Sequence, residues 1–505
     1  MSRVTEIKTV SINFTKQCQT IKSYEEALAL VYWDMRTGIP PKGTQQRSEV
    51  VGLLSAEIFR LSTAPEFMKN LTFLKTVQDE VEPLVQALII EMSKKAALFE
   101  AIPADEYAAY AVLQSKAEAA WSEARDQSDY KIFQPHLEEI IAYKKKFIGY
   151  WGEKATSYDT LLDQFEPGMT VAILDEVFAE VREAVIALLK QTQAAPHQPK
   201  SNLLERSFAK DKQIAFSREI LTKMGFDFEA GRIDDTIHPF AITMNQGDVR
   251  ITTRYDEMNF KMAVLGLIHE GGHAIYEQNI APEYDGTPLS EGVSMGIHES
   301  QSLFYEIILG SSRAFWEDNY TRFQHYAAPS FDDVSFESFY EALNVTEPSL
   351  VRIEADILTY ALHIIIRYEI EKAIFNDDLD VKELPTVWKA KYKEYLGIEP
   401  KNDLEGILQD IHWAGGDFGY FPSYLLGLLN AAQLEVAMRQ TIDIEATVAT
   451  GDYTVIKNWL TENVHQFGKA KEPLAIMVDA TGEKLNPKYL IDFLTKRYKD
   501  VYKLK

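Results

Sequence analysis

The stretch Ala263-Val-Leu-Gly-Leu-Ile-His-Glu-Gly-Gly-His-Ala-Ile-Tyr276 decides how the rest of the chain is organised. Residues four apart lie on one face of a helix, so His269 and His273 can turn imidazole nitrogens toward the same metal ion. Glu270 lies beside them, where its carboxylate can reach a water bound to the metal. This His-Glu-x-x-His pattern is typical of zinc hydrolases, although two hydrogen-bonded histidines on a buried helix would show the same letters.

Two adjacent glycines interrupt this helix. Gly271 and Gly272 together cost about 2 kcal/mol of helix propensity relative to alanine. Such a cost is tolerated where another backbone or a substrate comes too close for a side chain. We therefore predict a close approach at these two positions.

A third metal ligand is expected from the segment that follows. After a break over 279–288, Ser290 can cap a second helix that returns antiparallel to the first. The ligand helix extends about six residues past His273, and Glu299 lies about nine residues into the second helix, so at 1.5 Å per residue Glu299 returns to the level of the histidines. Two imidazoles and one carboxylate leave an open position on a zinc ion.

Other polar residues of the second helix are less suited to bind the metal directly. Glu291 comes too early in the helix, and Glu306 lies about two turns too far along it. His298 points away from the Glu299 face, which suits a contact to a ligand residue or to substrate groups.

The composition is that of a globular, acidic protein. The chain has 505 residues, of which 46% are apolar, and a net charge of −24. That charge argues against nucleic acid or an anionic membrane as a partner. No uncharged run is long and apolar enough to span a bilayer, and the first residues contain no signal-peptide core. The single cysteine, Cys18, excludes an internal disulfide and suits a reducing compartment, so we expect a cytoplasmic protein.

The fold is expected to be mainly α-helical. Apolar residues recur at intervals of three and four from 24 to 189 and again from 424 to 505, with charged residues between them. The polar segment 191–202 contains two prolines and reads as a surface loop. We expect a single domain, 1–505, in which this loop can mark the boundary between two lobes around a cleft.

One short region departs from the helical pattern. Residues 240–244 and 249–254 alternate in hydrophobicity and are β-branched, and 245–248 suits the turn between them, which predicts a β-hairpin. An edge of such a small sheet can hold an extended peptide. The strands could equally serve only to cover the core.

Residues 350–374 are expected to form one long helix. Arg352, Asp356, His363 and Arg367 fall close to one stripe of that helix, among apolar residues. Buried charges need partners or ligands, so these residues form either structural ion pairs or part of a binding site.

The segment 406–422 is rich in glycine and aromatic residues, which suits a rigid loop lining a pocket. It contains His412, Trp413 and Tyr420. If the metal site is hydrolytic, His412 or Tyr420 could donate a hydrogen bond to the oxyanion of the reaction.

Several motifs together resemble the thermostable, Taq-type carboxypeptidases of metallopeptidase family M32. The resemblance covers essentially the whole chain, in order and without a departure at any motif position. The motifs are Trp33-Asp-Met-Arg-Thr-Gly-Ile-Pro-Pro41, Asp248-Val-Arg-Ile-Thr252, His269-Glu-Gly-Gly-His273, His298-Glu-Ser-Gln301, Ile366-Arg-Tyr-Glu-Ile-Glu-Lys-Ala-Ile374 and Gly406-Ile-Leu-Gln-Asp-Ile-His-Trp413.

The resemblance implies a large helical body with a deep active-site cleft and one small sheet, similar to neurolysin and angiotensin-converting enzyme. It also implies a homodimer, one zinc ion per chain that cobalt can replace, and removal of single residues from peptide C-termini with broad preference. By position, the metal ligands are His269, His273 and Glu299, and the general base is Glu270. The family motifs also place around the cleft, for substrate binding or support of the ligands, Asp248, Arg250, Thr252, His298, Gln301, Arg367 and His412. From their position and chemistry we infer the same kind of role for Arg352 and Tyr420, and His238 is a further candidate.

An exopeptidase must also recognise the end of its substrate, and a fixed arginine can bind the terminal carboxylate. Arg352 is the first choice and Arg250 the second, whereas Arg367 is expected to pair with a neighbouring acid. A helical zinc endopeptidase or a dipeptidyl carboxypeptidase would share the same zinc motif. An aminopeptidase, or an interaction protein that has lost its activity, are further alternatives.

Overall fold

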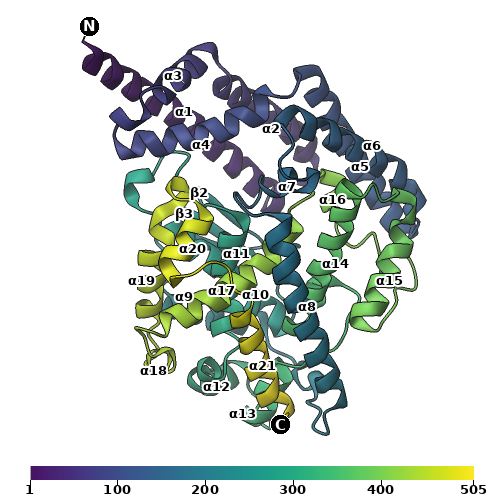
Figure 1. Ribbon diagram of the computed structural model, residues 1–505. Helices are drawn as coiled ribbons and strands as arrows, with labels where there is room; N and C mark the ends of the chain where they lie inside the picture. The colour runs from purple at the N-terminus through teal and green to yellow at the C-terminus, as the bar shows by residue number, and fades with distance from the viewer. Residues whose placement is uncertain (1) are drawn as a thin grey trace. The chain divides into compact units, whose positions relative to one another are not determined.

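The computed structural model describes residues 2–505, and helices make up most of the chain (Figure 1). The chain divides into two compact units. The first comprises residues up to 100, 204–336 and 434–483, and the second comprises 101–203, 337–433 and 484–505. The expected mainly α-helical fold with one small sheet is confirmed. The expectation of a single domain stays a prediction.

The first unit contains the small sheet and helices from three stretches of the chain. The helices are α1 (Arg3–Thr37), α2 (Thr44–Ser62), α3 (Pro65–Lys75), α4 (Pro83–Glu100), α9 (Lys210–Met224), α10 (Phe260–Gln278), α11 (Met295–Leu303), the π-helix η5 (Phe304–Leu309), α12 (Arg313–Ala327), α18 (Ile444–Ala449), α19 (Thr454–Asn463) and α20 (Pro473–Thr481).

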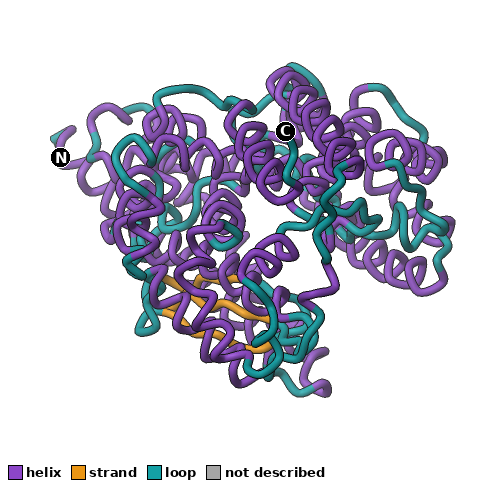
Figure 2. Tube along the Cα trace, turned by 90° about the horizontal axis from the view of Figure 1, so that it is seen from below, coloured by secondary structure: helices purple, strands orange, loops and turns teal. Residues whose placement is uncertain are grey.

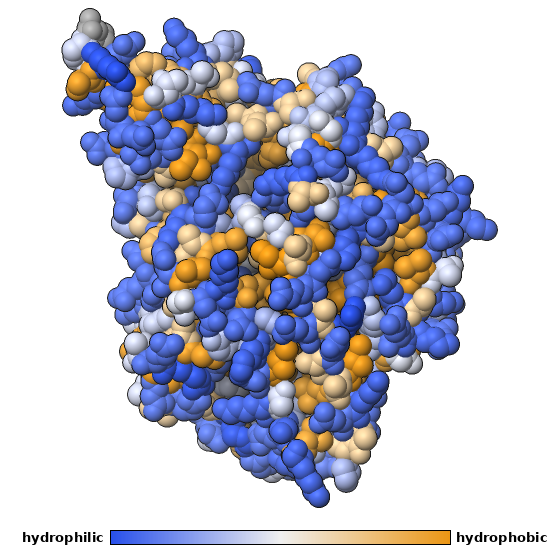
Figure 3. All heavy atoms as spheres, in the orientation of Figure 1, coloured by the Kyte–Doolittle hydropathy of each residue, from blue (hydrophilic) through white to orange (hydrophobic). Residues whose placement is uncertain are grey.

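The described part of the second unit consists of helices and the loops that connect them. Its helices are α5 (Ala104–Gln127), α6 (Tyr130–Trp151), α7 (Ser157–Leu162), α8 (Val171–Ala194), α13 (Phe336–Leu343), α14 (Ile357–Asn376), α15 (Leu384–Leu396), α16 (His412–Gly415), the first part of α17 (Phe421–Met438) and α21 (Lys488–Tyr502). Among the helices described in the two units, none is both long and apolar enough to cross a membrane. On the face drawn in Figure 3, hydrophilic side chains predominate and apolar ones lie in small groups.

The three strands form one small sheet, drawn in orange in Figure 2. Strands β2 (Ala241–Asn245) and β3 (Asp248–Thr253) pair antiparallel, which confirms the predicted hairpin. A third strand, β1 (Gly231–Asp235), pairs parallel with β3 and gives the order β1-β3-β2. We did not predict β1, because three of its five residues are charged and hide the strand pattern. Since β3 is paired on both sides, only β1 and β2 offer an edge.

Helix α10 is positioned by the buried face of the sheet. Val249 and Ile251 of β3 are fully buried, as are Val264 and Leu267 of α10, and α10 packs against that strand. The apolar residues that precede the His-Glu-x-x-His motif therefore fix the helix before the motif begins.

The second helix of the motif region begins later than predicted. Helix α11 starts at Met295, and the Oγ of Ser294 accepts a hydrogen bond from the Ile297 N–H at 3.1 Å. The Oγ of Ser290 instead donates to the carbonyl oxygen of Thr287 at 2.9 Å. The predicted cap at Ser290 was wrong because that hydroxyl belongs to the preceding turn. Glu299 consequently lies in the second turn of the helix.

The long helix predicted over 350–374 was also wrong at its start. Helix α14 begins at Ile357, because the carboxylate of Asp356 caps it by accepting hydrogen bonds from the N–H groups of Leu358 and Thr359 at 2.9 and 3.1 Å. Arg352 lies before the cap, in a short 3₁₀ turn, η6 (Arg352–Glu354). It therefore does not share a helical stripe with Arg367.

The predicted close approach at the two glycines is confirmed. A Cβ at Gly272 would lie 2.6 Å from the backbone oxygen of Gln301 and 2.7 Å from the Cα of Ser302, both on α11. A Cβ at Gly271 would lie 2.3 Å from a side-chain carbon of Leu221 on α9. The absence of side chains lets α10 and α11 pack backbone to backbone at the motif.

The glycines of α10 give a matched pair of substitutions. Gly272→Ala should destabilise the protein by about 1–3 kcal/mol or more, because the new methyl group meets the α11 backbone. Gly266→Ala should be neutral or stabilising by up to about 1 kcal/mol, because it gains helix propensity and its nearest neighbour, the Oγ1 of Thr253, would be 3.8 Å away. Thermal unfolding followed by circular dichroism measures both, and equal stability of the two variants would contradict this packing.

Candidate active site

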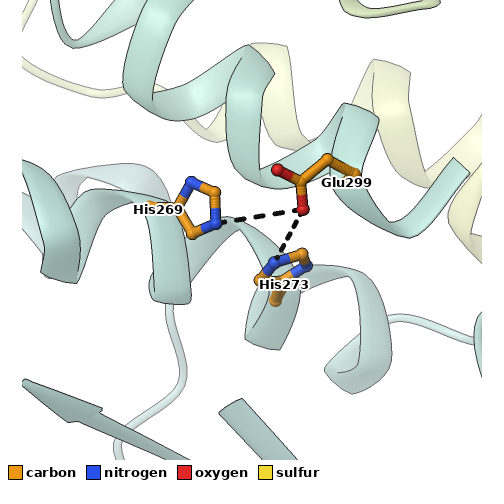
Figure 4. Close-up of side chains that lie close together, drawn as sticks. All are labelled: His269, His273 and Glu299. Carbon is orange, nitrogen blue, oxygen red and sulfur yellow. Dashed lines mark ion pairs between the residues drawn. The ribbon is translucent and has the colours of Figure 1, made fainter. Parts of the chain in front are cut away.

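Three side chains converge where α10 and α11 meet (Figure 4). The Nε2 atoms of His269 and His273 lie 4.0 and 3.6 Å from the Oε2 of Glu299. Ligand atoms around a tetrahedral zinc ion are separated by roughly 3.5 Å, given metal–ligand distances near 2.1 Å. Among the residues that the structure describes, this is the one group of histidine, cysteine and acidic side chains arranged to hold a metal ion.

His269 is oriented by a second carboxylate from η5. Its Nδ1 lies 2.9 Å from the Oε2 of Glu306. With Nε2 turned toward the metal position, the proton of the neutral ring lies on Nδ1 and is donated to Glu306. We did not predict this contact from the sequence, because a spacing of 3.6 residues per turn misplaces side chains on a π-helix.

The electrostatics of the site favour a bound cation. Burial by itself lowers the pKa of the His269 imidazole, but nearby carboxylates outweigh burial and raise that pKa to about 10. These carboxylates belong to Glu299, Glu306 and Glu270. A site that draws a proton this strongly has an excess of negative charge, which a divalent metal ion would also neutralise.

Glu270 lies on α10 between the two histidines and is only 8% exposed. Burial raises the pKa of its carboxyl group to about 7, with the nearby carboxylates adding to the shift and His269 opposing it. A carboxylate with a pKa near neutrality is suited to take up and release a proton during a reaction.

The predicted residues of β3 lie in the same unit but make local contacts. The guanidinium of Arg250 donates two hydrogen bonds to the carboxylate of Asp248, both at 2.7 Å, and lies over the ring of Trp33. The Oγ1 of Thr252 donates to the carbonyl oxygen of Phe240 at 3.0 Å. Together they fix the start of β2 and the orientation of Arg250.

A cavity of about 880 Å³ lies beside this strand and is lined by Arg250, Trp33 and the edge strand β1, together with the end of α1. His238, in the loop between β1 and β2, is exposed. The structure gives His238 no contact that would assign it to the site.

Gln301 and His298 lie on α11 beside Glu299. The Oε1 of Gln301 lies 2.9 Å from the Nε2 of the buried His465, and its Nε2 donates to the Oγ of Ser300 at 2.8 Å. Gln301 therefore anchors α11 within the unit. The ring of His298 lies against His273, with their Nδ1 atoms 2.5 Å apart.

The remaining predicted residues belong to the second unit, where two arginines share one carboxylate. Arg352 donates to the Oδ1 of Asp410 at 2.8 and 3.0 Å, and Arg367 donates to the Oδ2 at 2.7 Å. Burial raises the pKa of Asp410, but the two guanidinium groups outweigh burial and hold that pKa well below its usual range. The cluster has one positive charge in excess.

His412 and Tyr420 lie in the glycine-rich segment of this unit. The Nε2 of His412 lies 3.2 Å from the hydroxyl of Tyr424, and its ring packs against Tyr420. Burial lowers the pKa of His412 to about 4, with the two arginines adding to the shift. The imidazole is therefore neutral near pH 7 and adds no charge to the arginine cluster.

Comparison with known proteins identifies the family. Residues 13–498 match the family model of the carboxypeptidase Taq (M32) metallopeptidases. The chain belongs to metallopeptidase family M32. It is 49% identical to carboxypeptidase 1 of Bacillus subtilis (strain 168) over 500 residues, which cover 99% of this chain and all of that one. It is 38% identical to thermostable carboxypeptidase 1 of Thermus thermophilus over 94% of this chain and 95% of that one.

A solved structure agrees with this assignment. The M32 carboxypeptidase from Deinococcus radiodurans R1 superposes with a TM-score of 0.95 at 32% identity, covering 98% of this chain and all of that one. The protein is thus a metallocarboxypeptidase, a hydrolase of peptide bonds that uses a divalent metal ion. The two imidazole nitrogens and the carboxylate on α10 and α11 fit such an ion.

The charge balance of the arginine cluster can be tested in this M32 enzyme. Asp410→Asn should destabilise it by about 3–5 kcal/mol, because two buried guanidinium groups would lose their carboxylate. The control Asp126→Asn, at an exposed position on α5 of the same unit, should change stability by no more than about 0.5 kcal/mol. Urea unfolding of both variants measures the difference, and a wild-type midpoint for Asp410→Asn would contradict the role of Asp410.

Proposed function

We propose that this M32 enzyme is a zinc-dependent carboxypeptidase that removes single residues from peptide C-termini with broad preference. The observation that carries the proposal is the convergence of the two α10 histidines and Glu299 on one point. Two imidazoles and one carboxylate form a ligand set of catalytic zinc sites, which leave a position open for substrate. The family resemblance adds that cobalt can replace the zinc.

The chemistry divides between the ion and Glu270. A zinc ion held by His269, His273 and Glu299 would polarise the carbonyl of the last peptide bond and lower the pKa of a water molecule beside it. Glu270 takes the proton of the attacking water and then delivers it to the leaving amine. Its burial and its pKa near 7 support both steps.

We further propose that Arg352 binds the terminal carboxylate of the substrate. Its cluster holds two guanidinium groups against one carboxylate, so an anion would complete the charge balance. Of the two arginines, Arg367 is fully buried and Arg352 keeps 7% of its surface exposed. Arg250 is a weaker candidate, because Asp248 already balances its charge.

His412 and Tyr420 are proposed as further polar partners of a substrate bound at Arg352, with either one a candidate donor to the oxyanion. Their packing against each other within the same unit supports a shared role. Within the family's activity, a dipeptidyl carboxypeptidase is the alternative to removal of single residues. Mass spectrometry of a digested peptide separates the two, because single-residue removal gives a ladder spaced by one residue.

We also propose that the chain forms a homodimer. Helix α2 supports this, because among its described residues only Ser62 is buried, while Leu53 and Val50 are 71% and 37% exposed. Sedimentation equilibrium, which gives the mass of the particle, tests the proposal. The cytoplasmic location stays a prediction.

Glu270→Gln should retain zinc and lose turnover by about 10²- to 10⁴-fold, because the amide keeps the shape of the side chain but cannot take up the proton. Zinc content measured on the same sample is the control. Turnover close to wild type in a fully loaded variant would show that Glu270 is not the base.

Arg352→Ala should slow cleavage of peptides with a free C-terminus by about 10- to 100-fold, the effect of losing a charge-assisted hydrogen bond of about 1.5–3 kcal/mol. C-terminally amidated peptides, which are poor substrates already, should be little affected. Arg250→Ala is the matched comparison. If Arg352→Ala slows both kinds of peptide equally, or slows neither, Arg352 does not bind the end of the substrate. If Arg250→Ala then slows only the peptides with a free C-terminus, Arg250 binds it instead.

A further inference from the structure

We infer that Glu277 is a positioning residue for the metal site, holding His298 in the one tautomer that can accept a hydrogen bond from His273. The inference rests on the proposed function, because it takes His273 to be a metal ligand. Glu277 lies one turn beyond His273 on α10 and is 5% exposed. None of the family motifs quoted above includes it.

Three side chains form a continuous chain of contacts behind the ligand cluster. The Nε2 of His273 faces Glu299, and its Nδ1 lies 2.5 Å from the Nδ1 of His298. The Nε2 of His298 in turn lies 2.9 Å from the Oε1 of Glu277. The chain therefore runs from the metal position through two imidazoles to a buried carboxylate.

The protons along this chain can be placed by elimination. A ligand nitrogen must offer its lone pair, so the single proton of the neutral His273 ring lies on Nδ1. That N–H can donate to His298 only if the Nδ1 of His298 carries no proton. The proton of His298 then lies on its Nε2 and is donated to the carboxylate of Glu277, which has only acceptors to offer.

The loop before α11 holds Glu277 and His298 in this arrangement. The N–H of Gly292 donates to the same Oε1 of Glu277 at 2.9 Å. A Cβ at Gly292 would lie 2.4 Å from the Cδ2 of His298, so this position has no room for a side chain. The ring of Tyr276 lies 5.4 Å from that of His298, and its hydroxyl accepts a hydrogen bond from the Val293 N–H at 3.2 Å.

The two histidine ligands are thus supported in different ways. His269 donates directly to the carboxylate of Glu306, whereas His273 reaches the carboxylate of Glu277 only through His298. The indirect arrangement depends on one tautomer of His298. Without an acceptor at position 277, His298 can carry its proton on either nitrogen, and one of the two forms turns an N–H toward the N–H of His273.

The test compares zinc affinities of three variants by competition with a chelator at constant pH. Glu277→Met removes the acceptor at similar length and should weaken zinc binding by about 10- to 100-fold, whereas Glu277→Gln keeps an acceptor oxygen and should stay within about threefold of wild type. The matched control is Glu283→Met, at an exposed position beyond the same helix, which should bind zinc as wild type does. Wild-type affinity for Glu277→Met would overturn the inference.

Two further measurements keep the outcome interpretable. His273→Ala should weaken zinc binding more than Glu277→Met does. If His273→Ala binds zinc as tightly as wild type, the proposed metal site is wrong. If His273→Ala weakens zinc binding and Glu277→Met does not, only the role of Glu277 is refuted. Nitrogen-15 NMR of zinc-loaded wild-type protein reports the tautomer directly and needs no variant at position 277. His298, assigned by its absence in His298→Gln, should be protonated on Nε2 and unprotonated on Nδ1, and the opposite pattern would overturn the inference.

Discussion

The contact between the backbones of α10 and α11 at Gly272 is the constraint on which the site depends. Because Gly272 has no side chain, α11 approaches until Gln301 and Ser302 lie against α10. That approach brings Glu299 to the two histidines and His298 to His273. If the two helices lay farther apart, Glu299 on α11 would be separated from the two histidines on α10. Helix α10 also packs against the buried strand β3 of the small sheet.

Each of the two units carries a buried imbalance of charge, and the two imbalances have opposite sign. Around His269, three carboxylates surround one imidazole, which favours a divalent cation. Around Asp410, two guanidinium groups share one carboxylate, which favours an anion. A metallocarboxypeptidase has to bind both a metal ion and a substrate that ends in a carboxylate. Buried charges are costly unless they are paired, so the signs of the two imbalances agree with the ligands that we propose.

Much of the site could be predicted from the sequence because helical spacing and local hydrogen-bonding rules determine it. The convergence of His269 and His273 follows from helical periodicity, and the close approach at the two glycines follows from their cost in helix propensity. The β-hairpin follows from alternating apolar, β-branched residues on either side of a turn. The predicted helix starts were wrong where a side chain could form either of two local hydrogen bonds. The hydroxyl of Ser290 closes a turn, and Ser294 caps α11 instead. Asp356 caps the start of α14 at a point where the sequence predicted an uninterrupted helix. The contact of Glu306 with His269 depends on a π-helix, and the proposed role of Glu277 depends on the tautomer of His298. Neither feature leaves a pattern in the sequence.

We propose that the α10 and α11 side chains hold one zinc ion per chain. Crystals of the zinc-loaded protein, measured at the zinc absorption edge, test this most directly, because anomalous scattering locates the metal without assuming its ligands. We expect a single strong peak about 2.0–2.2 Å from the Nε2 atoms of His269 and His273 and from a carboxylate oxygen of Glu299. A peak held by other residues, or none between these three, would contradict it.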